Sequence, residues 1–308
     1  MKHEPKIAIL LCSYNGGAYI RRQLDSIISQ SYSNWVLYIS DDGSTDETLD
    51  IVYEYKKRLG DGRVQVFSGP GQGFAWNFIS LVDKVPGDFD YYAFSDQDDE
   101  WLNFKLDKAV QLLITDDSIP QLYCGRTQLV DEDNCRLGLS PLFTRKPCFR
   151  NALVQSIAGG NTMIFNRASK NIILKTPSNS KIISHDWWIY ILVTGCGGRV
   201  IYDKQPTILY RQHQNNIIGA NKGISARLSR LLGVIDGRYK KWIQANLDVL
   251  EEIEINFTED NRFVLNNSIR ARKSGFFKRI YIFSKIKLFR QTLVGSFAFI
   301  IAIMMNKV

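Results

Sequence analysis

Apolar runs and amphipathic segments alternate through the first 115 residues, and this alternation restricts the possible folds more than any other feature of the chain. The first run, IAILLCS at 7–13, is apolar enough for a strand buried on both faces of a sheet. The segment after it places Ile20, Leu24 and Ile27 at helical spacing. Further strands are predicted at 35–40, 63–67 and 90–95, and further helices end near 59, 85 and 114. Strands separated by helices in this way predict a mostly parallel sheet with helices on both faces.

The second half of the chain is less regular. It contains a predicted loop and short strand at 159–166, a helix at 185–194, and strands at 198–203 and 207–211. Beyond Gly219 the alternation stops, and the residues 222–256 have a helical pattern. The chain is therefore predicted to consist of an α/β domain over 1–219 and a helical region over 220–308.

Cysteine usage and missing signatures exclude several classes of protein. The five cysteines are odd in number and no two have CxxC spacing, which argues against a zinc ribbon, a redox dithiol and a disulfide scaffold. The sequence has no P-loop, no GxGxxG after the first run, no GxSxG and no HExxH. Kinases, Rossmann dehydrogenases, α/β-hydrolases and zinc proteases therefore lose their usual support. The first apolar run leads into a polar turn, so we expect a strand and not a secretory signal.

The net charge of +8 comes from the C-terminal part of the chain. Residues 270–308 contain nine basic residues and no acidic one. Subtracting these nine from 39 leaves 30 basic residues against 31 acidic ones in the first 269 residues. Because the α/β part has no basic excess, a nucleic-acid partner is not expected.

Polar clusters follow three of the predicted strands. They are Ser13-Tyr14-Asn15, then Asp41-Asp42-Gly43-Ser44, then Ser95-Asp96-Gln97-Asp98-Asp99. In open α/β sheets, ligands bind in the crevice outside the carboxyl ends of the strands. A single acidic strand end would indicate a turn or a helix cap, but three polar ends on one rim predict a binding site.

The third cluster has the composition of a site for a divalent cation. Neighbouring carboxylates raise one another's pKa unless a cation neutralises them. Mg²⁺ or Mn²⁺ is often held by one or two carboxylates together with a substrate diphosphate. Asp96 and Asp98 alternate along a strand end, so both can face the same side. The alternative is a solvated acidic turn in which Asp99 caps the next helix; the preceding apolar strand and Trp101 favour the metal site.

Asp42 and Tyr14 are candidates for binding a nucleotide base. The carboxylate could accept the imide N–H of a pyrimidine, and the ring could stack on the base. Ser44 and Glu47 have the spacing of a capping box, so the same segment could form a type I turn and start a helix that Gly60 stops. Both interpretations can hold together.

Asp186 and His213 could take part in chemistry, but both have structural alternatives. A carboxylate at the edge of a cleft could remove a proton from an attacking hydroxyl, whereas Asp186 could equally be an N-cap. His213 could contact a metal or a diphosphate, although a lone histidine is usually structural.

Six segments, in order, resemble the family 2 inverting glycosyltransferases with the GT-A fold: ILLCSYNGGAYIRRQLDSIISQSYSNW, ISDDGSTDET, FSDQDDEW, GGNTMIFN, HDWW and YRQHQNNIIG. The resemblance covers about residues 5–219. DDGSTD is shared across the family, while SDQDDEW with HDWW and YRQH is narrower and resembles bacterial rhamnosyltransferases of surface polysaccharide synthesis. The resemblance implies an α/β fold of the GT-A type: a Rossmann-like mixed sheet with helices on both faces, plus a C-terminal helical tail.

The resemblance also implies a role for each candidate residue. Residues 1–115 would form the half that binds the nucleotide-sugar, and 116–219 the half that binds the acceptor and carries out catalysis. The nucleotide would be bound by Ser13, Tyr14, Asn15, Asp42 and Asp96. Asp96, Asp98 and His213 would hold or adjoin Mg²⁺ or Mn²⁺, and Asp186 would be the catalytic base. The acceptor or the sugar would contact Gly160, Asn161, Thr162 and Trp187.

The implied reaction is a metal-dependent direct displacement that inverts the anomeric carbon. The expected donor is dTDP-L-rhamnose, and the expected acceptor is a polyprenol-diphosphate-linked saccharide in O-antigen, capsule or cell-wall synthesis. Alternatives are a UDP-hexose donor, a sugar nucleotidyltransferase, or a membrane-associated module that only binds a partner. A nucleotidyltransferase usually has a Gly- and Arg-rich first loop, where this chain has Ser-Tyr-Asn.

The C-terminal tail resembles a segment that lies on a membrane. LVGSFAFIIAIMM at 293–305 is thirteen residues long, which is short for crossing a bilayer. The basic and apolar stretch before it could lie in the membrane interface. We therefore expect a peripheral protein at the cytoplasmic face of the bacterial inner membrane; the alternative is a helix packed on the catalytic domain or in a dimer.

Overall fold

A seven-stranded mixed sheet forms the centre of the protein, in a computed structural model that describes residues 4–114, 117–178, 180–213, 238–253 and 255–307. The strand order is β10-β6-β9-β4-β1-β2-β3. The bounds are β1 Ile7–Ser13, β2 Trp35–Asp41, β3 Val64–Ser68, β4 Tyr91–Ser95, β6 Gln121–Gly125, β9 Ile164–Asn166 and β10 Arg199–Asp203. β9 runs antiparallel to β4 and β6, while β1, β2, β3 and β4 pair in parallel. The α/β fold with a mixed sheet is therefore confirmed.

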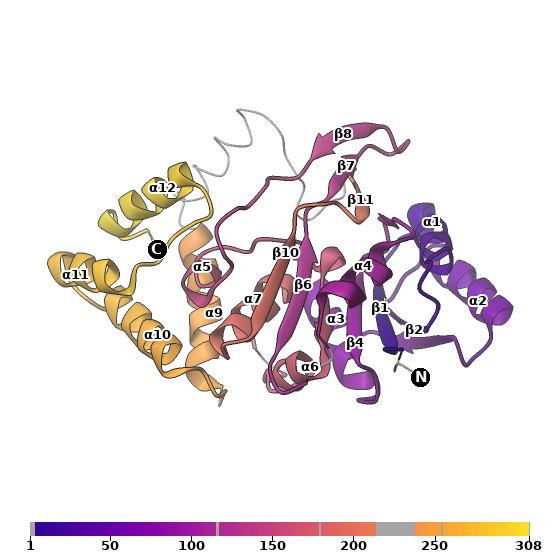
Figure 1. The fold of residues 1–308 in the computed structure, drawn as a ribbon, viewed down its shortest axis with the longest axis horizontal. Coiled ribbons are helices and arrows are strands. Elements are labelled where there is room, and N and C mark those ends of the chain that lie inside the picture. Colours follow the sequence, from indigo (N-terminus) through magenta and orange to yellow (C-terminus); the bar gives the residue numbers. More distant parts are fainter. Residues whose placement is uncertain (1–3, 115–116, 179, 214–237, 254, 308) are drawn as a thin grey trace.

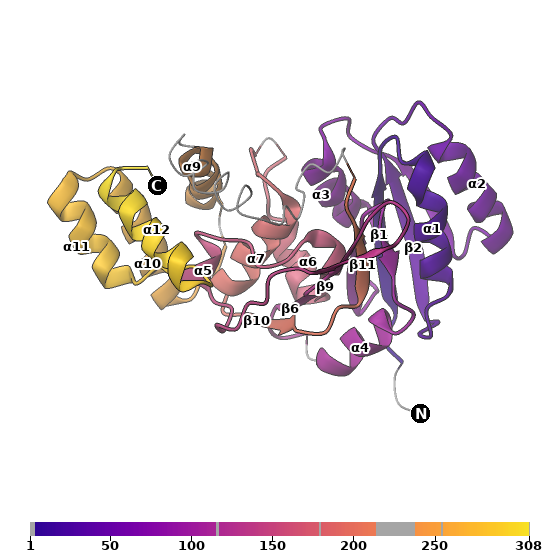
Figure 2. The same ribbon diagram turned by 90° about the horizontal axis from the view of Figure 1, so that it is seen from above.

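Helices cover both faces of this sheet, because successive side chains of β1 point to opposite sides. Ala8 and Leu10 pack in one apolar cluster with α3 (Phe74–Lys84) and α7 (His185–Gly195). Ile7 and Ile9 pack in a second cluster with three helices, which are α1 (Gly17–Ile28), α2 (Thr48–Leu59) and α4 (Lys105–Leu112). Figure 2 shows α3 and α4 on opposite sides of the strands. This burial on both faces explains the continuous apolar run of β1.

A second, four-stranded sheet lies beyond the carboxyl ends of the main strands (Figure 1). Its order is β5-β11-β7-β8, with bounds β5 Glu100–Trp101, β11 Ile208–Arg211, β7 Gln128–Val130 and β8 Arg136–Leu139. β5 comes directly after the acidic loop 96–99, so this sheet supports the rim where the site was predicted. Only β11 was predicted, because β5 and β7 have two and three residues and β8 is mostly exposed, with no apolar face to reveal it.

The start of α2 differs from the prediction. The helix begins at Thr48, and Glu47 before it makes no side-chain cap. The Ser44 hydroxyl and N–H donate to the Asp41 carboxylate, at 2.6 and 2.7 Å, because that buried carboxylate needs donors. The predicted capping box is therefore wrong, while Gly60 does end the helix, with φ of 86°.

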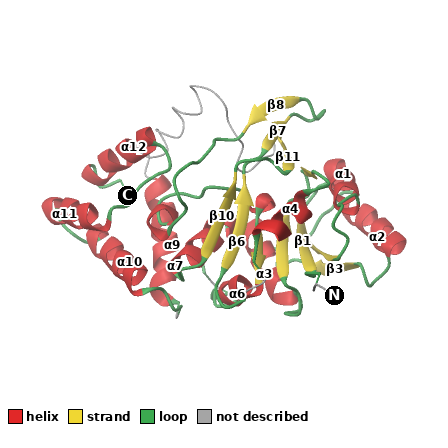
Figure 3. Cartoon of the chain, viewed as in Figure 1, coloured by secondary structure: helices red, strands yellow, loops and turns green. Residues whose placement is uncertain are grey.

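The C-terminal helices gather beside β10, at the opposite end of the molecule from α1 and α2 (Figures 1 and 3). They are α9 Arg238–Glu252, α10 Glu259–Arg272, α11 Phe276–Ile286 and α12 Leu293–Met304. They join α5 (Phe149–Ala152) through the Arg150–Asp260 ion pair of 2.6 Å and the Phe149–Phe257 ring contact. α9 confirms part of the helical stretch predicted at 222–256. The described residues do not include 214–237, which hold the start of that stretch, the end of the last motif and the boundary at 219. The division into two domains therefore stays a prediction.

Candidate active site

Three carboxylates from two separate elements share one electrostatic environment. Asp96 and Asp98 follow β4, and Asp186 lies in the first turn of α7. The pKa of Asp96 is raised to about 8, first by burial and then by the charges of Asp98 and Asp186. Carboxylates act on one another in this way only when they are close together in a poorly solvated site. The packing agrees, because the ring of His185, next to Asp186, lies 5.0 Å from the ring of Phe94, two residues before Asp96. The fold therefore brings the start of α7 to the strand end that leads into the acidic loop.

Asp186 has the environment of a proton acceptor. Burial raises the pKa of its carboxyl, while hydrogen bonds from the Ser184 side chain and the Trp187 backbone lower it. The Trp187 N–H donates to Oδ1 at 2.7 Å. The helix N-terminus favours the anion there. A carboxylate whose pKa is raised by burial is a stronger base than a solvated one.

His213 reaches the same acidic loop from the end of β11. Its Nε2 lies 2.8 Å from Asp98 Oδ2, and its ring stacks on Tyr19 at 5.0 Å. The predicted proximity of His213 to the acidic loop is thus present, and its contact with a metal stays a prediction. Among the residues that the structure describes, no group of three or more His, Cys, Asp or Glu side chains is arranged to hold a metal ion.

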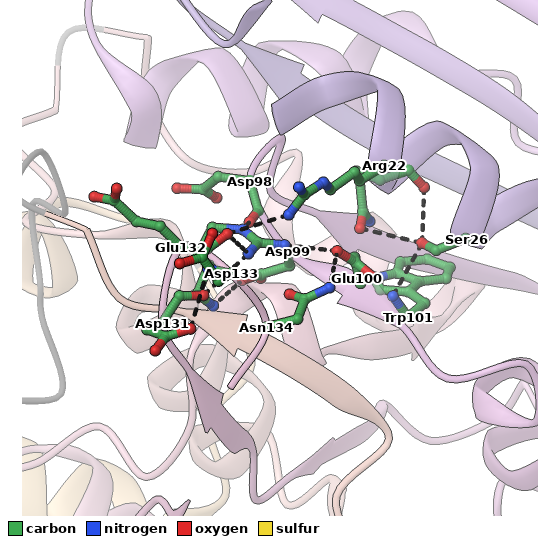
Figure 4. A network of polar contacts seen from close by, with 12 residues as sticks. Arg22, Ser26, Asp98, Asp99, Glu100, Trp101, Asp131, Glu132, Asp133 and Asn134 are labelled. Atoms are coloured by element: carbon green, nitrogen blue, oxygen red, sulfur yellow. Dashed lines mark hydrogen bonds and ion pairs between the residues drawn. The ribbon is translucent and has the colours of Figure 1, made fainter. Parts of the chain in front are cut away.

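Arg211 was not singled out in the sequence analysis, but from the end of β11 it fixes the backbone of the acidic loop. Its fully buried guanidinium donates to the Asp98 carbonyl at 3.1 Å and to Glu100 Oε1 at 2.6 Å. It also donates to the carbonyls of Asp131 and Glu132, at 3.1 and 2.8 Å. Figure 4 shows Asp98 and Glu100 beside Asp131 and Glu132 in this network. One cation thereby joins the loop that carries Asp98 to the turn between β7 and β8.

The residues predicted to bind the nucleotide surround the end of β1. β1 pairs with β2 on one side, Ser13 beside Asp41, and with β4 on the other, Leu11 beside Ser95, so Asp42 and Asp96 flank this strand end. Tyr14 is 58% exposed at the rim. Asp42 accepts hydrogen bonds from the N–H groups of Gly71 and Gly73, at 2.7 and 3.0 Å. A carboxylate has further lone pairs, so these bonds leave acceptor capacity for a base.

Ser13 and Asn15 are engaged within the protein. The buried Ser13 hydroxyl donates to Asp41 at 2.7 Å. Asn15 has φ of 47° and accepts the Thr45 N–H at 2.9 Å, so it shapes the loop after β1. Their contact with a nucleotide stays a prediction, and the side chain of Ser13 points toward Asp41.

Gln97 is a further residue that the sequence analysis did not single out. Its amide accepts the Tyr14 N–H at 2.8 Å and donates to the Tyr14 carbonyl at 2.9 Å. Gly16 permits this approach, because a Cβ there would lie 2.1 Å from Gln97 Oε1. The side chain between Asp96 and Asp98 therefore holds the backbone of the predicted base-binding loop.

Replacing Gln97 by alanine should raise the KM for the donor about tenfold, with a smaller change in kcat. Two exposed hydrogen bonds, each worth about 0.7 kcal/mol, fix the Tyr14 loop relative to Asp96, and their loss of about 1.4 kcal/mol corresponds to a factor of about ten. Steady-state kinetics of Gln97→Ala would measure this. The matched control is Gln65→Ala on β3, whose amide donates only to the Asp61 carbonyl. Equal kinetics for both variants would refute the positioning role.

The residues predicted to contact the acceptor are largely buried. Asn161 donates to the Asp99 carboxylate, and the Thr162 hydroxyl donates to the Gly159 carbonyl at 2.8 Å. The Trp187 indole donates to the Ala152 carbonyl at 2.7 Å from within the core. These side chains have structural partners, and their contact with an acceptor stays a prediction. Asp99 is likewise buried and does not cap α4, which follows Phe104.

Gly160 is required by a close approach of His185. A Cβ at position 160 would lie 2.0 Å from His185 Nε2. The imidazole stacks on Phe78 at 4.0 Å and meets Phe94 edge-on at 5.0 Å. Burial lowers the pKa of His185 to about 3, so the ring is neutral. The small Gly160 lets His185 pack against Phe94 of β4, and this contact holds the first turn of α7, which contains Asp186, against the sheet.

The mixed sheet, the acidic loop after β4 and the carboxylate at the start of α7 define a glycosyltransferase of the GT-A fold. The chain belongs to glycosyl transferase family 2, whose family model matches residues 8–173. It is 31% identical over 248 residues to the dTDP-rhamnosyl transferase RfbG of Shigella flexneri, covering 75% of this chain and 81% of that protein. It is 27% identical over 225 residues to the putative teichuronic acid biosynthesis glycosyltransferase TuaG of Bacillus subtilis, covering 73% and 85%.

A solved structure supports the same fold. The mannosyltransferase PcManGT from Pyrobaculum calidifontis, in complex with GDP-Man and Mn²⁺, superposes with a TM-score of 0.52. The match covers 99% of this chain and 88% of that one at 14% identity. At this identity the likeness concerns the fold alone.

Proposed function

We propose that this glycosyltransferase moves L-rhamnose from dTDP-L-rhamnose to a hydroxyl of a lipid-linked saccharide in surface polysaccharide synthesis, with inversion. The observation that carries the proposal is the packing of the start of α7, which bears Asp186, against the end of β4, which leads into the acidic loop: the His185 and Phe94 rings lie 5.0 Å apart. A base and a diphosphate site must lie on either side of the anomeric carbon for a direct displacement. Family membership sets aside the alternative of a module without catalytic activity.

Asp186 acts as the general base in this proposal. It removes the proton from the acceptor hydroxyl as that oxygen attacks the anomeric carbon. The bond from this carbon to the diphosphate oxygen breaks in the same step, and its electron pair leaves with dTDP. One displacement inverts the carbon and needs no sugar bound covalently to the enzyme.

Asp96 and Asp98 fit a divalent cation by their chemistry. Both offer carboxylate oxygens on one loop, and the crowding that raises the pKa of Asp96 would be relieved by a cation. Mg²⁺ or Mn²⁺, when bound there, would neutralise the charge of the leaving diphosphate. Gln97, between them, keeps this loop in register with Tyr14, which stacks on the base while Asp42 accepts its imide N–H.

The donor and the pathway are supported by the relatives. The likeness to RfbG favours dTDP-rhamnose over a UDP-hexose, and the likeness to TuaG favours a role in surface polysaccharide synthesis. A sugar nucleotidyltransferase is disfavoured because the loop after β1 presents Tyr14 and Asn15 to the rim instead of an Arg-rich stretch.

Thermal unfolding with a panel of nucleotide-sugars and Mn²⁺ tests the donor. We expect dTDP-rhamnose at 100 times its Kd to raise the free energy of unfolding by about 2.7 kcal/mol. At the same concentration, UDP-glucose, UDP-galactose and UDP-N-acetylglucosamine should raise it less. Omitting Mn²⁺ should weaken the shift. A larger shift with a UDP-sugar would overturn the rhamnose assignment, and an equal shift without Mn²⁺ would overturn the metal requirement.

A further inference from the structure

We propose that the outer face of α12, with a cluster of cations at its C-terminal end, docks this protein onto the surface of an anionic phospholipid bilayer. The occupant is the bilayer itself, recognised by apolar side chains and by lipid phosphate groups. This surface lies in the C-terminal helices, outside the proposed active site.

α12 has one buried apolar face and one exposed apolar face. Phe299, Ala302 and Ile303 face inward, and Phe299 lies edge-on to Phe283 of α11. The outward residues recur at helical spacing and form what we name the apolar face: Leu293, Val294, Phe297, Ile300, Ile301 and Met304. Leu293 is 86% exposed, Val294 80% and Phe297 66%. A contiguous apolar surface of this kind marks an interaction site.

The same helix is built to lie on a bilayer and not to cross it. Its twelve residues span about 18 Å, against about 30 Å for the hydrocarbon core. In the described part of the chain, no helix is long and apolar enough to span a membrane. A short helix whose exposed side chains are apolar can bury them in the boundary between headgroups and acyl chains.

Four basic residues lie close together at the C-terminal end of α12: Lys240, Arg272, Arg279 and Lys307. The Lys240 ammonium donates to the Asn306 carbonyl and the Arg279 guanidinium to its side chain, both at 2.8 Å, so the two cations share one residue. Arg272 donates to the Lys240 carbonyl at 3.1 Å, and Lys307 follows Asn306. Burial lowers the pKa of Lys240, and the charges of Arg272, Arg279 and Lys307 lower it further.

This cation cluster has few acidic partners within the described part of the protein. Asp248 is the carboxylate whose charge acts on Arg272, and residues 270–308 contain no acid of their own. A lipid phosphate group beside the accessible cations of the cluster, Lys240 and Lys307, would reduce the repulsion among them. Each basic residue at an anionic surface strengthens membrane binding about fivefold, so the cluster selects charged lipids.

Flotation of the full chain with vesicles tests the proposal. We expect at least tenfold tighter binding to vesicles of phosphatidylcholine with phosphatidylglycerol than to phosphatidylcholine alone. Leu293→Ser with Phe297→Ser should weaken binding at least tenfold, and Lys240→Ser with Lys307→Ser should remove the preference for anionic vesicles. The matched control is Tyr53→Ser, an aromatic side chain 54% exposed on α2 at the other end of the molecule, which should bind as the wild type does.

Two outcomes would overturn the proposal. One is unchanged vesicle binding in both double variants. The other is a wild-type dimer in size-exclusion chromatography that becomes a monomer on Leu293→Ser with Phe297→Ser and binds no vesicles, since a second copy would then cover the apolar face. Donor stabilisation in the thermal assay needs no membrane, so failure of docking and failure of the proposed reaction are distinguishable.

Discussion

Asp186→Asn is expected to lower kcat by about 10²–10⁴-fold while donor binding changes less than about twofold. The amide keeps the shape of the carboxylate but cannot accept the proton of the acceptor hydroxyl. Donor binding should persist, because the residues proposed to contact the thymine ring and the diphosphate of the donor lie in the loops after β1, β2 and β4. Single-turnover transfer and donor titration by calorimetry would separate the two effects.

Asp50→Asn provides a matched control for this variant. Asp50 is an exposed acidic residue in the first turn of α2, as Asp186 is an acidic residue in the first turn of α7. Each substitution removes the interaction of one carboxylate with a helix N-terminus, which is worth about 0.3–1 kcal/mol. Normal turnover in both variants would remove Asp186 from the base role, and a parallel loss of donor affinity in Asp186→Asn would make it a binding residue.

The strands and helices of the main sheet could be predicted because their signals are local. β1 is continuously apolar because both of its faces are buried, and α1 is amphipathic because only one side of the helix packs on the sheet. The carboxyl-end rule then placed Asp42, Asp96 and Asp98 on one rim without any knowledge of strand order. The short strand β9 was predicted within 159–166, but its antiparallel direction was not, and a mixed sheet was expected only from the family resemblance.

The supports of the site could not be predicted, because their partners are distant in the chain and many are backbone atoms. Gln97 binds the backbone of Tyr14, 83 positions away, and a glutamine between two aspartates gives no sign of this. The contact of Gly160 with an acceptor stays a prediction, while the close approach of His185 that requires glycine there could not be predicted from the sequence. Such close approaches depend on tertiary packing, and no periodic pattern encodes them.

Arg211→Met should lower the free energy of unfolding by about 3–5 kcal/mol, which is a large part of the stability of a typical domain. Arg211 is fully buried, and its guanidinium lies 2.6 Å from Glu100. Methionine fills a similar volume but leaves the Glu100 carboxylate without its cation and the Asp98 carbonyl without the guanidinium donor. Uncompensated charges and acceptors in the interior are costly, so the acidic loop should loosen and thermal unfolding should begin there.

Arg21→Met is the matched control, because it also removes an arginine that pairs with a glutamate, but at an exposed position. Arg21 pairs with Glu54 at 2.8 Å, but the two side chains are 49% and 57% exposed, and such surface pairs contribute about 0–1 kcal/mol. Denaturant titration of both variants should therefore give a loss several times larger for Arg211→Met. Adding Glu100→Gln to Arg211→Met removes the orphaned charge and should recover part of the loss. If the two single variants were equally stable, or the double variant were less stable than Arg211→Met, Arg211 would not be the cation that holds the acidic loop.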